Sequence, residues 1–377
     1  MSQQVKGGSS VPPAEVISVG LVTPVGLSAE AAAAAIAAGR NQGHMSSVVN
    51  KANERQGMHL IDEASLAPLD SALNSIECTA AHRRMLRLGG PALAEALQGC
   101  EPPPPLLLAL PEVPTERSDP VGAPFISQLA VQAHVQLDEA QSATYRQGGA
   151  GALYALADAL ALLAGGKVPH VVVGGVDTFL DLRRLCELDV EGRIYGPPLR
   201  LGFMPGEGAG FLLLRAPKQP RPAGRQAGGA SPSRIAKVIA TGRGEEKGHR
   251  YSKEPYRGEG LAEAIGALFA SVPQDQPKVR CVYAGFNGEE LPAKEWGVAR
   301  LRNSERFAEA VQMEHPADCI GDSGAALGAI MLCLAAVEIG AGHAPPPRPI
   351  WAADDPGPTL VWSTSDREPR AAALLQW

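Results

Sequence analysis

The sequence predicts an α/β protein that is built as two successive, similar halves. Residues 142–177 hold an Ala/Leu-rich helix pattern followed by a short apolar strand pattern. A stretch rich in Pro, Gly and Ser, at 217–233, then interrupts the alternation. After it, strand and helix patterns start again and include a second Ala/Leu-rich helix. We therefore expect a structural duplication, with domains at 1–216 and 234–377 joined by a flexible connector at 217–233.

The stretch at 142–177 is the most informative part of the chain. Its helix, Ala150 to Ala164, is almost entirely Ala and Leu, so it is apolar on every side and is expected to be buried. Gly165 and Gly166 provide the stop signal. The strand His170 to Val173 is a continuous apolar run, typical of a strand that is covered on both faces.

The first half is expected to begin with a strand in Glu15 to Gly26 and a helix that Ser28 caps. Residues 40–80 are weakly patterned, which predicts loop with one short helix. Arg83 to Gln98 has helical spacing, but its Gly-Gly-Pro sequence predicts a kinked or broken helix. The remaining elements expected in this half are a strand at Leu106 to Leu110, a helix at Phe125 to Val135 and a strand at Ala209 to Arg215.

The second half is expected to repeat this alternation after the connector. The expected strands are Arg234 to Thr241, Val279 to Gly285 and, as the last, Leu360 to Ser363. The expected helices are Gly260 to Ser271, Trp296 to Val311 and the apolar Ser323 to Gly340. The charged residues 243–259 carry both signs and predict a solvated surface loop.

Composition excludes several classes of protein. The net charge is −6 without a basic stripe, so nucleic acid is not an expected partner. No run approaches the ~20 apolar residues of a membrane span, and the start lacks the apolar core of an export signal, so a cytoplasmic protein is expected. The six cysteines form no CxxC pair and the eight histidines show no ligand spacing. Disulfides, metal sites and cofactors are therefore not expected.

Four segments carry a resemblance to a known family. They are VGLVTPVGL near the start, GGKVPHVVVGGVD in the central stretch, GFMPGEGAGFLLL at 202–214 and GDSGAALGAI at 321–330. Over nearly the whole chain, their order and spacing resemble those of the β-ketoacyl synthases of the thiolase-like fold. This resemblance implies two similar α/β halves that form a five-layered α-β-α-β-α arrangement.

The resemblance also indicates which positions would carry condensing chemistry. A synthase of this family needs a cysteine at a helix N-terminus and two histidines that stabilise developing negative charge. The cysteine position matches Gly149, or Gln147 if the alignment shifts by two residues. The histidine positions match Gly285 and Asp322, and the lysine position matches Ala317. Ser363, Thr364, Ser365 and Asp366 stand where the family has a glycine-rich GFGG turn.

These losses imply a catalytically degenerate member of the family. It resembles the chain-length factor, a cysteine-less subunit that pairs with an active ketosynthase and shapes its acyl pocket. The implied partners are that synthase and an acyl carrier protein, and a homodimer is also possible. The helix at 150–164 and the strand at 170–173 would form the contact face, because both are too apolar for a free surface.

Other interpretations of the same residues stay open. The chain could be an adaptor or scaffold in an unrelated assembly, such as a secretion system. It could also be a decarboxylase or hydrolase with relocated chemistry at Asp322, Cys319 or Gln147. The glycines at 148, 149 and 151 are also typical of close packing, Gln147 of bonding to local backbone, and Asp322 of a helix cap.

Overall fold

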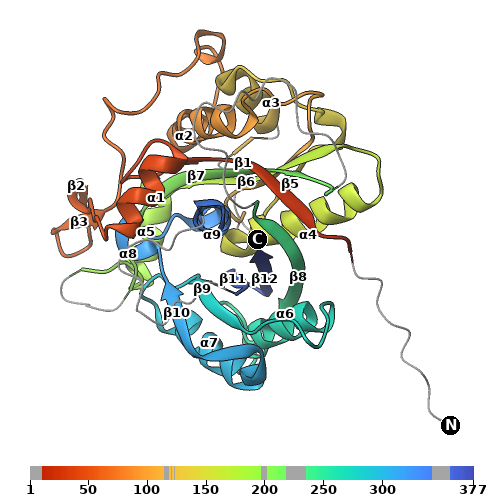
Figure 1. Cartoon of the computed structure of the whole chain (residues 1–377). Coiled ribbons are helices and arrows are strands. Elements are labelled where there is room, and N and C mark those ends of the chain that lie inside the picture. Colours follow the sequence, from red (N-terminus) through yellow and green to blue (C-terminus); the bar gives the residue numbers. More distant parts are fainter. Residues whose placement is uncertain are drawn as a thin grey trace.

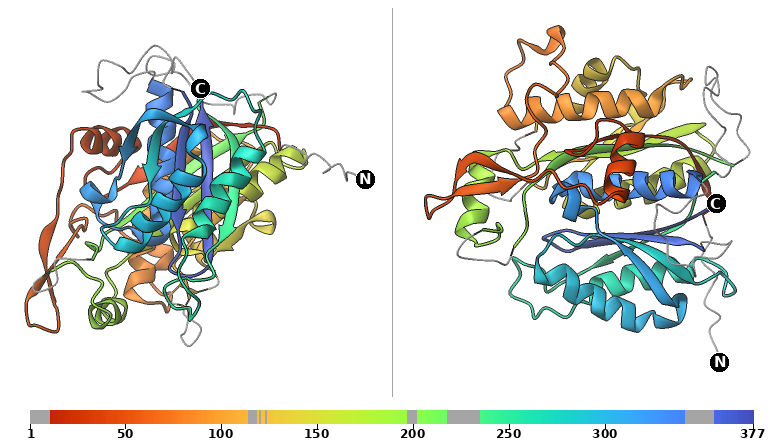
Figure 2. Two further views of the ribbon diagram at one scale, coloured as in Figure 1. Left: turned by 90° about the horizontal axis from the view of Figure 1, so that it is seen from below. Right: turned by 60° about the vertical axis from the view of Figure 1, so that its left-hand side comes forward.

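The computed structural model describes residues 11–113, 119, 121–122, 124–196, 202–217, 235–341 and 357–377. Five layers, α-β-α-β-α, are stacked through the molecule (Figures 1 and 2). Helices α2 (Ala80–Leu97) and α3 (Phe125–Ala133) cover one outer face. Helices α6 (Glu259–Ala270) and α7 (Glu290–Arg302) cover the other. The five-layered α/β fold expected from the resemblance is confirmed.

Ten strands form one sheet, which is continuous between the halves because β1 pairs with β8. Its two five-stranded parts, called here the first and the second sheet, repeat one topology. In the first half the order is β1-β7-β6-β4-β5, and in the second it is β8-β12-β11-β9-β10. In each half the fifth strand along the chain, β7 or β12, is antiparallel to both of its neighbours, and the other pairs are parallel. The bounds are β1 Ala14–Val22, β4 Leu106–Ala109, β5 Ala143–Tyr145, β6 His170–Thr178, β7 Glu207–Arg215, β8 Lys237–Glu245, β9 Val279–Ala284, β10 Phe307–Glu314, β11 Thr359–Thr364 and β12 Pro369–Gln376.

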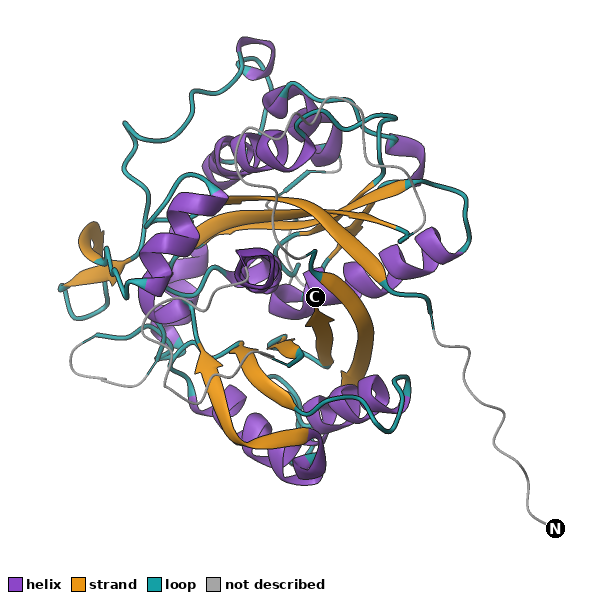
Figure 3. Ribbon diagram, viewed as in Figure 1, coloured by secondary structure: helices purple, strands orange, loops and turns teal. Residues whose placement is uncertain are grey.

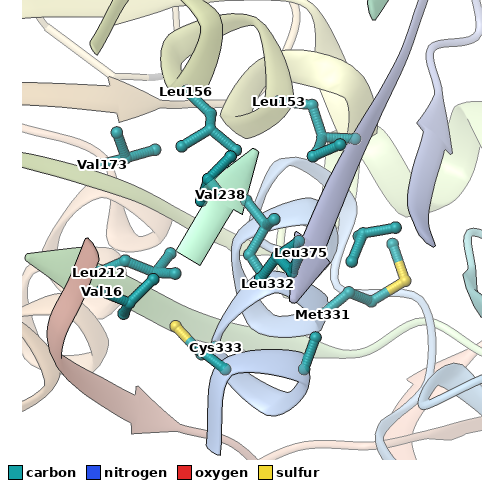
Figure 4. Packing of buried hydrophobic residues seen from close by; sticks show 14 of the residues in the cluster. Val16, Leu153, Leu156, Val173, Leu212, Val238, Met331, Leu332, Cys333 and Leu375 are labelled. Atoms are coloured by element: carbon teal, nitrogen blue, oxygen red, sulfur yellow. The ribbon is translucent and has the colours of Figure 1, made fainter. Parts of the chain in front are cut away.

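The middle layer is formed by helices α4 (Gly151–Ala164) and α9 (Leu327–Ala341), which lie between the two sheets. Figure 4 shows Leu153 and Leu156 of α4 packed in a core with Val173 and Leu212 of the first sheet and with Met331, Leu332 and Cys333 of α9, Val238 and Leu375. Removing each such side chain from water stabilises the fold by about 1.5–3 kcal/mol. This double coverage explains why both helices are apolar around most of their circumference, as their sequences predicted.

Short 3₁₀ turns precede both central helices and place glycines where the two halves meet. The turn η3 (Gly148–Ala150) leads into α4, and η5 (Gly324–Ala326) leads into α9. The other short helical elements in the described ranges are α1 (Ala29–Ala37), η1 (Ser71–Leu73), η2 (Glu139–Gln141), α5 (Leu182–Val190), η4 (Ser304–Arg306) and α8 (Ala317–Ile320). Ser28 caps α1 as predicted, because its Oγ accepts a hydrogen bond from Ala31 N at 3.3 Å.

Of the kinked or broken helix predicted at Arg83 to Gln98, the break is wrong. Helix α2 runs without a break through Pro91. It packs so closely against β1 that a Cβ on Gly20 would lie 1.9 Å from the carbonyl oxygen of Ala92. On its other side, a Cβ on Gly90 would lie 2.6 Å from Gln132 of α3. Contacts on both sides therefore hold the helix in place and offset the hydrogen bond that proline cannot donate.

Several short strands were also missed. The region at 40–80 contains a hairpin of β2 (His44–Val49) and β3 (Arg55–Met58), which projects from the body (Figures 1 and 3). The helix expected at Trp296 to Val311 ends at Arg302, and β10 follows it. The strand expected to be last, β11, is followed by β12, whose three consecutive alanines are poor strand formers. Pairing on both sides of β12, rather than local preference, explains this strand.

The predicted connector at 217–233 lies, apart from Pro217, outside the described residues. The domain boundaries at 1–216 and 234–377 therefore stay predictions. The strand predicted at Arg234 to Thr241 extends further than expected. It is β8, which ends at Glu245, inside the segment 243–259 that was predicted to be a surface loop. Among the helices in the described ranges, none is long and apolar enough to cross a membrane.

Candidate functional site

A cavity of about 450 Å³ lies where the two halves meet, beside the turn that leads into α4. Of the positions singled out by the sequence, Gly149, Gly285 and Asp322 line it. The four residues from Ser363 to Asp366, at the end of β11, line it as well. The fold thus brings together positions that are more than 200 residues apart along the chain.

The space in front of Gly149 is occupied by the end of β11. A Cβ built on Gly149 would lie 2.8 Å from Ser363 Oγ and 2.8 Å from the carbonyl oxygen of Thr364. A Cβ built on Gly285 would point to the same place, 3.2 Å from Ser363 Oγ. Contacts below 3.0 Å are not tolerated without movement, and a backbone carbonyl cannot rotate away as a side chain can. This arrangement has no room for a side chain at residue 149.

Asp322 is bonded inside the fold. Its Oδ2 accepts a hydrogen bond from Asn287 Nδ2 at 2.8 Å, and its Oδ1 accepts one from Gly324 N at 2.7 Å. The second bond reaches the first residue of η5, but the N-cap position of this turn is Ser323, so Asp322 lies one residue before the capping position expected from the sequence. Burial raises the pKa of Asp322 although both hydrogen bonds oppose this effect. Asp322 therefore accepts two hydrogen bonds within the fold and holds its proton more tightly than an ordinary aspartate.

Three other singled-out residues lie outside the residues that line the cavity. Ala317 begins the short helix α8 and is buried. Gln147 precedes the turn η3, and its buried Oε1 has no hydrogen-bond partner among the described residues. Cys319 is buried, and both burial and Asp318 raise its pKa, which disfavours a reactive thiolate. Two histidines lie nearby: His315 approaches Asp318 with Nδ1 at 3.5 Å, and His59 forms a hydrogen bond with the backbone of Cys319.

A network of ion pairs at the cavity was not anticipated from the sequence. Arg193 is 7% exposed in its side chain and donates to Glu289 at 2.8 and 2.9 Å and to Asp366 at 2.8 and 2.9 Å. Arg250 also contacts both carboxylates, at 2.8 and 3.2 Å. Burial alone would raise the pKa of Asp366, but the two arginines hold it below its ordinary value. These four residues come from four separate loops, so no local motif could reveal them.

Two further cavity residues, Glu112 and Arg184, were also missed. Glu112 follows β4 and accepts a hydrogen bond from Ser365 Oγ. Burial raises the pKa of Glu112 to about 7. Arg184 belongs to α5 and donates from Nη1 to Asp177 Oδ1 at 2.8 Å. The position of Glu112 just after a buried strand was the one sequence signal available, since ligand sites in α/β folds lie at the carboxyl ends of strands.

This chain resembles known proteins in its three-dimensional structure but not in its sequence. No protein-family model and no curated protein matches this sequence. Solved structures do match. The ketosynthase from module 6 of the bacillaene synthase from Bacillus subtilis 168 superposes with a TM-score of 0.74 at 14% identity, over 96% of this chain and 72% of that one.

Two further matches extend over nearly the whole of both chains. The ishigamide ketosynthase/chain length factor gives a TM-score of 0.70 at 17% identity, over 97% of this chain and 99% of that chain. The second match is a structure of a type II PKS acyl-carrier protein in complex with its ketosynthase bound to the hexaketide. It gives a TM-score of 0.72 at 14% identity, over 97% of this chain and 99% of that chain.

This chain has the thiolase-like fold of the ketosynthases. At these identities the likeness concerns the fold, so the function must be argued from the site. Within the ketosynthase fold seen here, the described residues contain no group of three or more His, Cys, Asp or Glu side chains that could hold a metal ion.

Proposed function

We propose that this chain is a non-catalytic ketosynthase-like subunit that pairs with an active β-ketoacyl synthase in fatty acid or polyketide-type synthesis. The ketosynthase fold and the likeness to the ishigamide ketosynthase/chain length factor support this proposal. In this proposal Gly149, Gly285, Asp322 and Ala317 occupy the positions that carry condensing chemistry in the family.

The observation that carries the proposal is the contact between Gly149 and the end of β11. A nucleophile needs a side chain at the start of the helix, with space for an acyl group beside it. Here Ser363 Oγ and the carbonyl oxygen of Thr364 fill that space. The condensing reaction therefore has neither its nucleophile nor room for one at this position.

The proposed contact face differs from the one expected from the sequence. Strand β6 (His170–Thr178) is buried throughout and lies between β4 and β7, so it cannot meet a partner. The free edge on this side is β5, where Ala143 and Thr144 are exposed. An unpaired strand edge can add a strand from another chain. We therefore place the pairing face on β5.

A second candidate function is an adaptor in an unrelated assembly. The cavity favours it, because the charged residues Arg193, Arg250, Glu289 and Asp366 lie in its walls beside apolar ones, whereas an acyl chain would need a lining without buried charges. In the pairing proposal, this chain shapes the acyl pocket of its partner from outside and leaves its own cavity to polar ligands.

Co-purification separates the two functions. The full chain with an affinity tag is isolated from its own cell, and the complex is weighed intact and sequenced by mass spectrometry. A one-to-one complex with a cysteine-bearing ketosynthase supports the pairing function. A complex with other proteins, and without a ketosynthase, supports the adaptor and contradicts the pairing proposal.

A further inference from the structure

Arg184 presents part of its guanidinium to the cavity in a fixed position. Nη1 donates to Asp177 Oδ1 at 2.8 Å, and the guanidinium carbon lies 3.7 Å from the centroid of the Phe179 ring. Nε and Nη2 make no hydrogen bond to any described residue, and the side chain is 31% exposed. A guanidinium held from two sides in this way is pre-organised to donate to an acceptor in the cavity.

Glu112 presents a carboxyl oxygen to the same cavity. Its Oε1 accepts from Ser365 Oγ, and Ser365 Oγ in turn accepts from Arg367 N at 2.9 Å. The other oxygen, Oε2, has no hydrogen-bond partner among the described residues. Within the described part of the chain, Arg184 forms its ion pair with Asp177 and not with Glu112. The two groups therefore share a cavity without neutralising each other.

Several further charged groups line the cavity and have partners of their own. Glu187 lies 3.5 Å from Arg183, Glu191 lies 3.7 Å from Arg193, and Asp322 accepts a hydrogen bond from Asn287. Arg193 and Arg250 pair with Glu289 and Asp366. Arg370 pairs with Glu295 at 2.6 Å. Besides bonding Arg184, Asp177 accepts hydrogen bonds from the backbone amides of Thr178 and Ala325. An incoming ligand would thus meet Arg184 and Glu112 as groups with unused hydrogen-bonding capacity.

We propose that this cavity binds a small anion, through a carboxylate or phosphate group held between Arg184 and the carboxyl group of Glu112. Arg184 Nε and Nη2 would donate to one oxygen of the anion, and the Glu112 hydroxyl would donate to another. A volume of about 450 Å³ is in the range of small-molecule sites. The site does not depend on the proposed pairing with a synthase, because all of its groups belong to this chain.

Binding should follow the protonation of Glu112. The charged groups that face Glu112 are Arg184 of α5 and Asp366 and Arg367 of the turn after β11, while Arg146 beside η3 is paired with Asp119 at 2.6 Å. Burial, assisted by Asp366, outweighs the hydrogen bond from Ser365 and the two arginines, and raises the pKa of Glu112 to about 7. The acid can then donate to an anion at pH 6, whereas at pH 8 its carboxylate repels one.

The test is calorimetric titration of the full chain with sulfate and with acetate, whose charges are constant between pH 6 and pH 8. Sulfate reports a phosphate-type ligand and acetate a carboxylate-type ligand. We expect at least one probe to bind at pH 6 and to bind up to about tenfold more weakly at pH 8, which is the limit for a required proton on a group whose pKa is about 7. No binding of either probe at pH 6 overturns the proposal.

Three variants identify the site. Arg184→Gln should weaken binding about tenfold or more, whereas Arg183→Gln, at the neighbouring and 70% exposed arginine, should not change it. Glu112→Gln keeps a donor at every pH, so it should retain binding at pH 8 and remain folded because it is isosteric. Equal loss in both arginine variants, or an unchanged pH dependence in Glu112→Gln, overturns the assignment.

Discussion

Gly149, in the turn before α4, lies directly against Ser363 at the end of β11. The two residues belong to different halves of the chain, and a Cβ on Gly149 would lie 2.8 Å from Ser363 Oγ. The residue at the start of the first central helix is therefore constrained by a strand of the second half. In the proposed function, this contact makes the position of the family's nucleophile part of the packing between the halves.

The first prediction follows from this contact. Gly149→Ala should lower the free energy of unfolding by about 1–3 kcal/mol, because the methyl group would overlap Ser363 and Thr364. Gly297→Ala in α7 is the matched control, since a Cβ there would meet no atom within 4 Å. The control should be neutral or stabilising by up to about 1 kcal/mol. Urea unfolding of both variants measures the difference, and equal effects would contradict the packing argument.

The second prediction concerns the ion pairs of Arg193. Arg193→Gln should lower the free energy of unfolding by about 3–5 kcal/mol, because it leaves Glu289 and Asp366 without their shared buried partner. Arg183→Gln removes only an exposed pair with Glu187 and should cost less than about 0.5 kcal/mol. Thermal and urea unfolding report both values. A small effect of Arg193→Gln would contradict the prediction and would show that Arg250 alone can neutralise Glu289 and Asp366.

The third prediction is a pH dependence of stability from Glu112. Its folded pKa of about 7 exceeds the ordinary value of 4.5, so the folded state binds the proton more tightly than the unfolded chain. This contribution is fully present below about pH 4.5 and is lost as the pH rises through 7. Glu112→Gln should therefore gain stability relative to the wild type between pH 5 and pH 8, by about 2 kcal/mol. Urea unfolding at the two pH values checks this, and a pH-independent difference would refute it.

The fourth prediction tests the pairing face. Ala143→Lys on β5 places a charge on the proposed interface and should weaken the complex with the synthase about tenfold or more. Ala310→Lys, on the opposite edge strand β10, is also an exposed alanine and should leave the complex unchanged. Sedimentation or native mass spectrometry compares the two. Loss of the complex only in Ala310→Lys would move the interface to β10.

The sequence predicted the buried elements best. The Ala/Leu runs that became α4 and α9, and the apolar strand β6, are apolar because sheets and helices cover them on several sides. Their apolar composition therefore predicted their burial. Pro91 does not end its helix, because the contacts of α2 with β1 and α3 hold the helix in place on both sides.

The candidate site could be predicted only in part. The resemblance alone aligns Gly149, Gly285 and Asp322 with the cysteine and the two histidines of the family. It therefore predicted that the thiol and both imidazoles are missing. Arg193, Glu289, Asp366 and Glu112 come from loops far apart in the chain, and their meeting depends on the stacking of the two halves. No spacing rule encodes such a meeting, so it required the three-dimensional structure.

In the proposed function, this chain accepts no acyl group from an acyl carrier protein. The most direct measurement is the intact mass of the purified full chain after incubation with an acyl-carrier-protein thioester, beside an active ketosynthase as the positive control. The account predicts an unchanged mass for this chain and a mass increase for the control. An added acyl mass, mapped to a single residue of this chain, would contradict it.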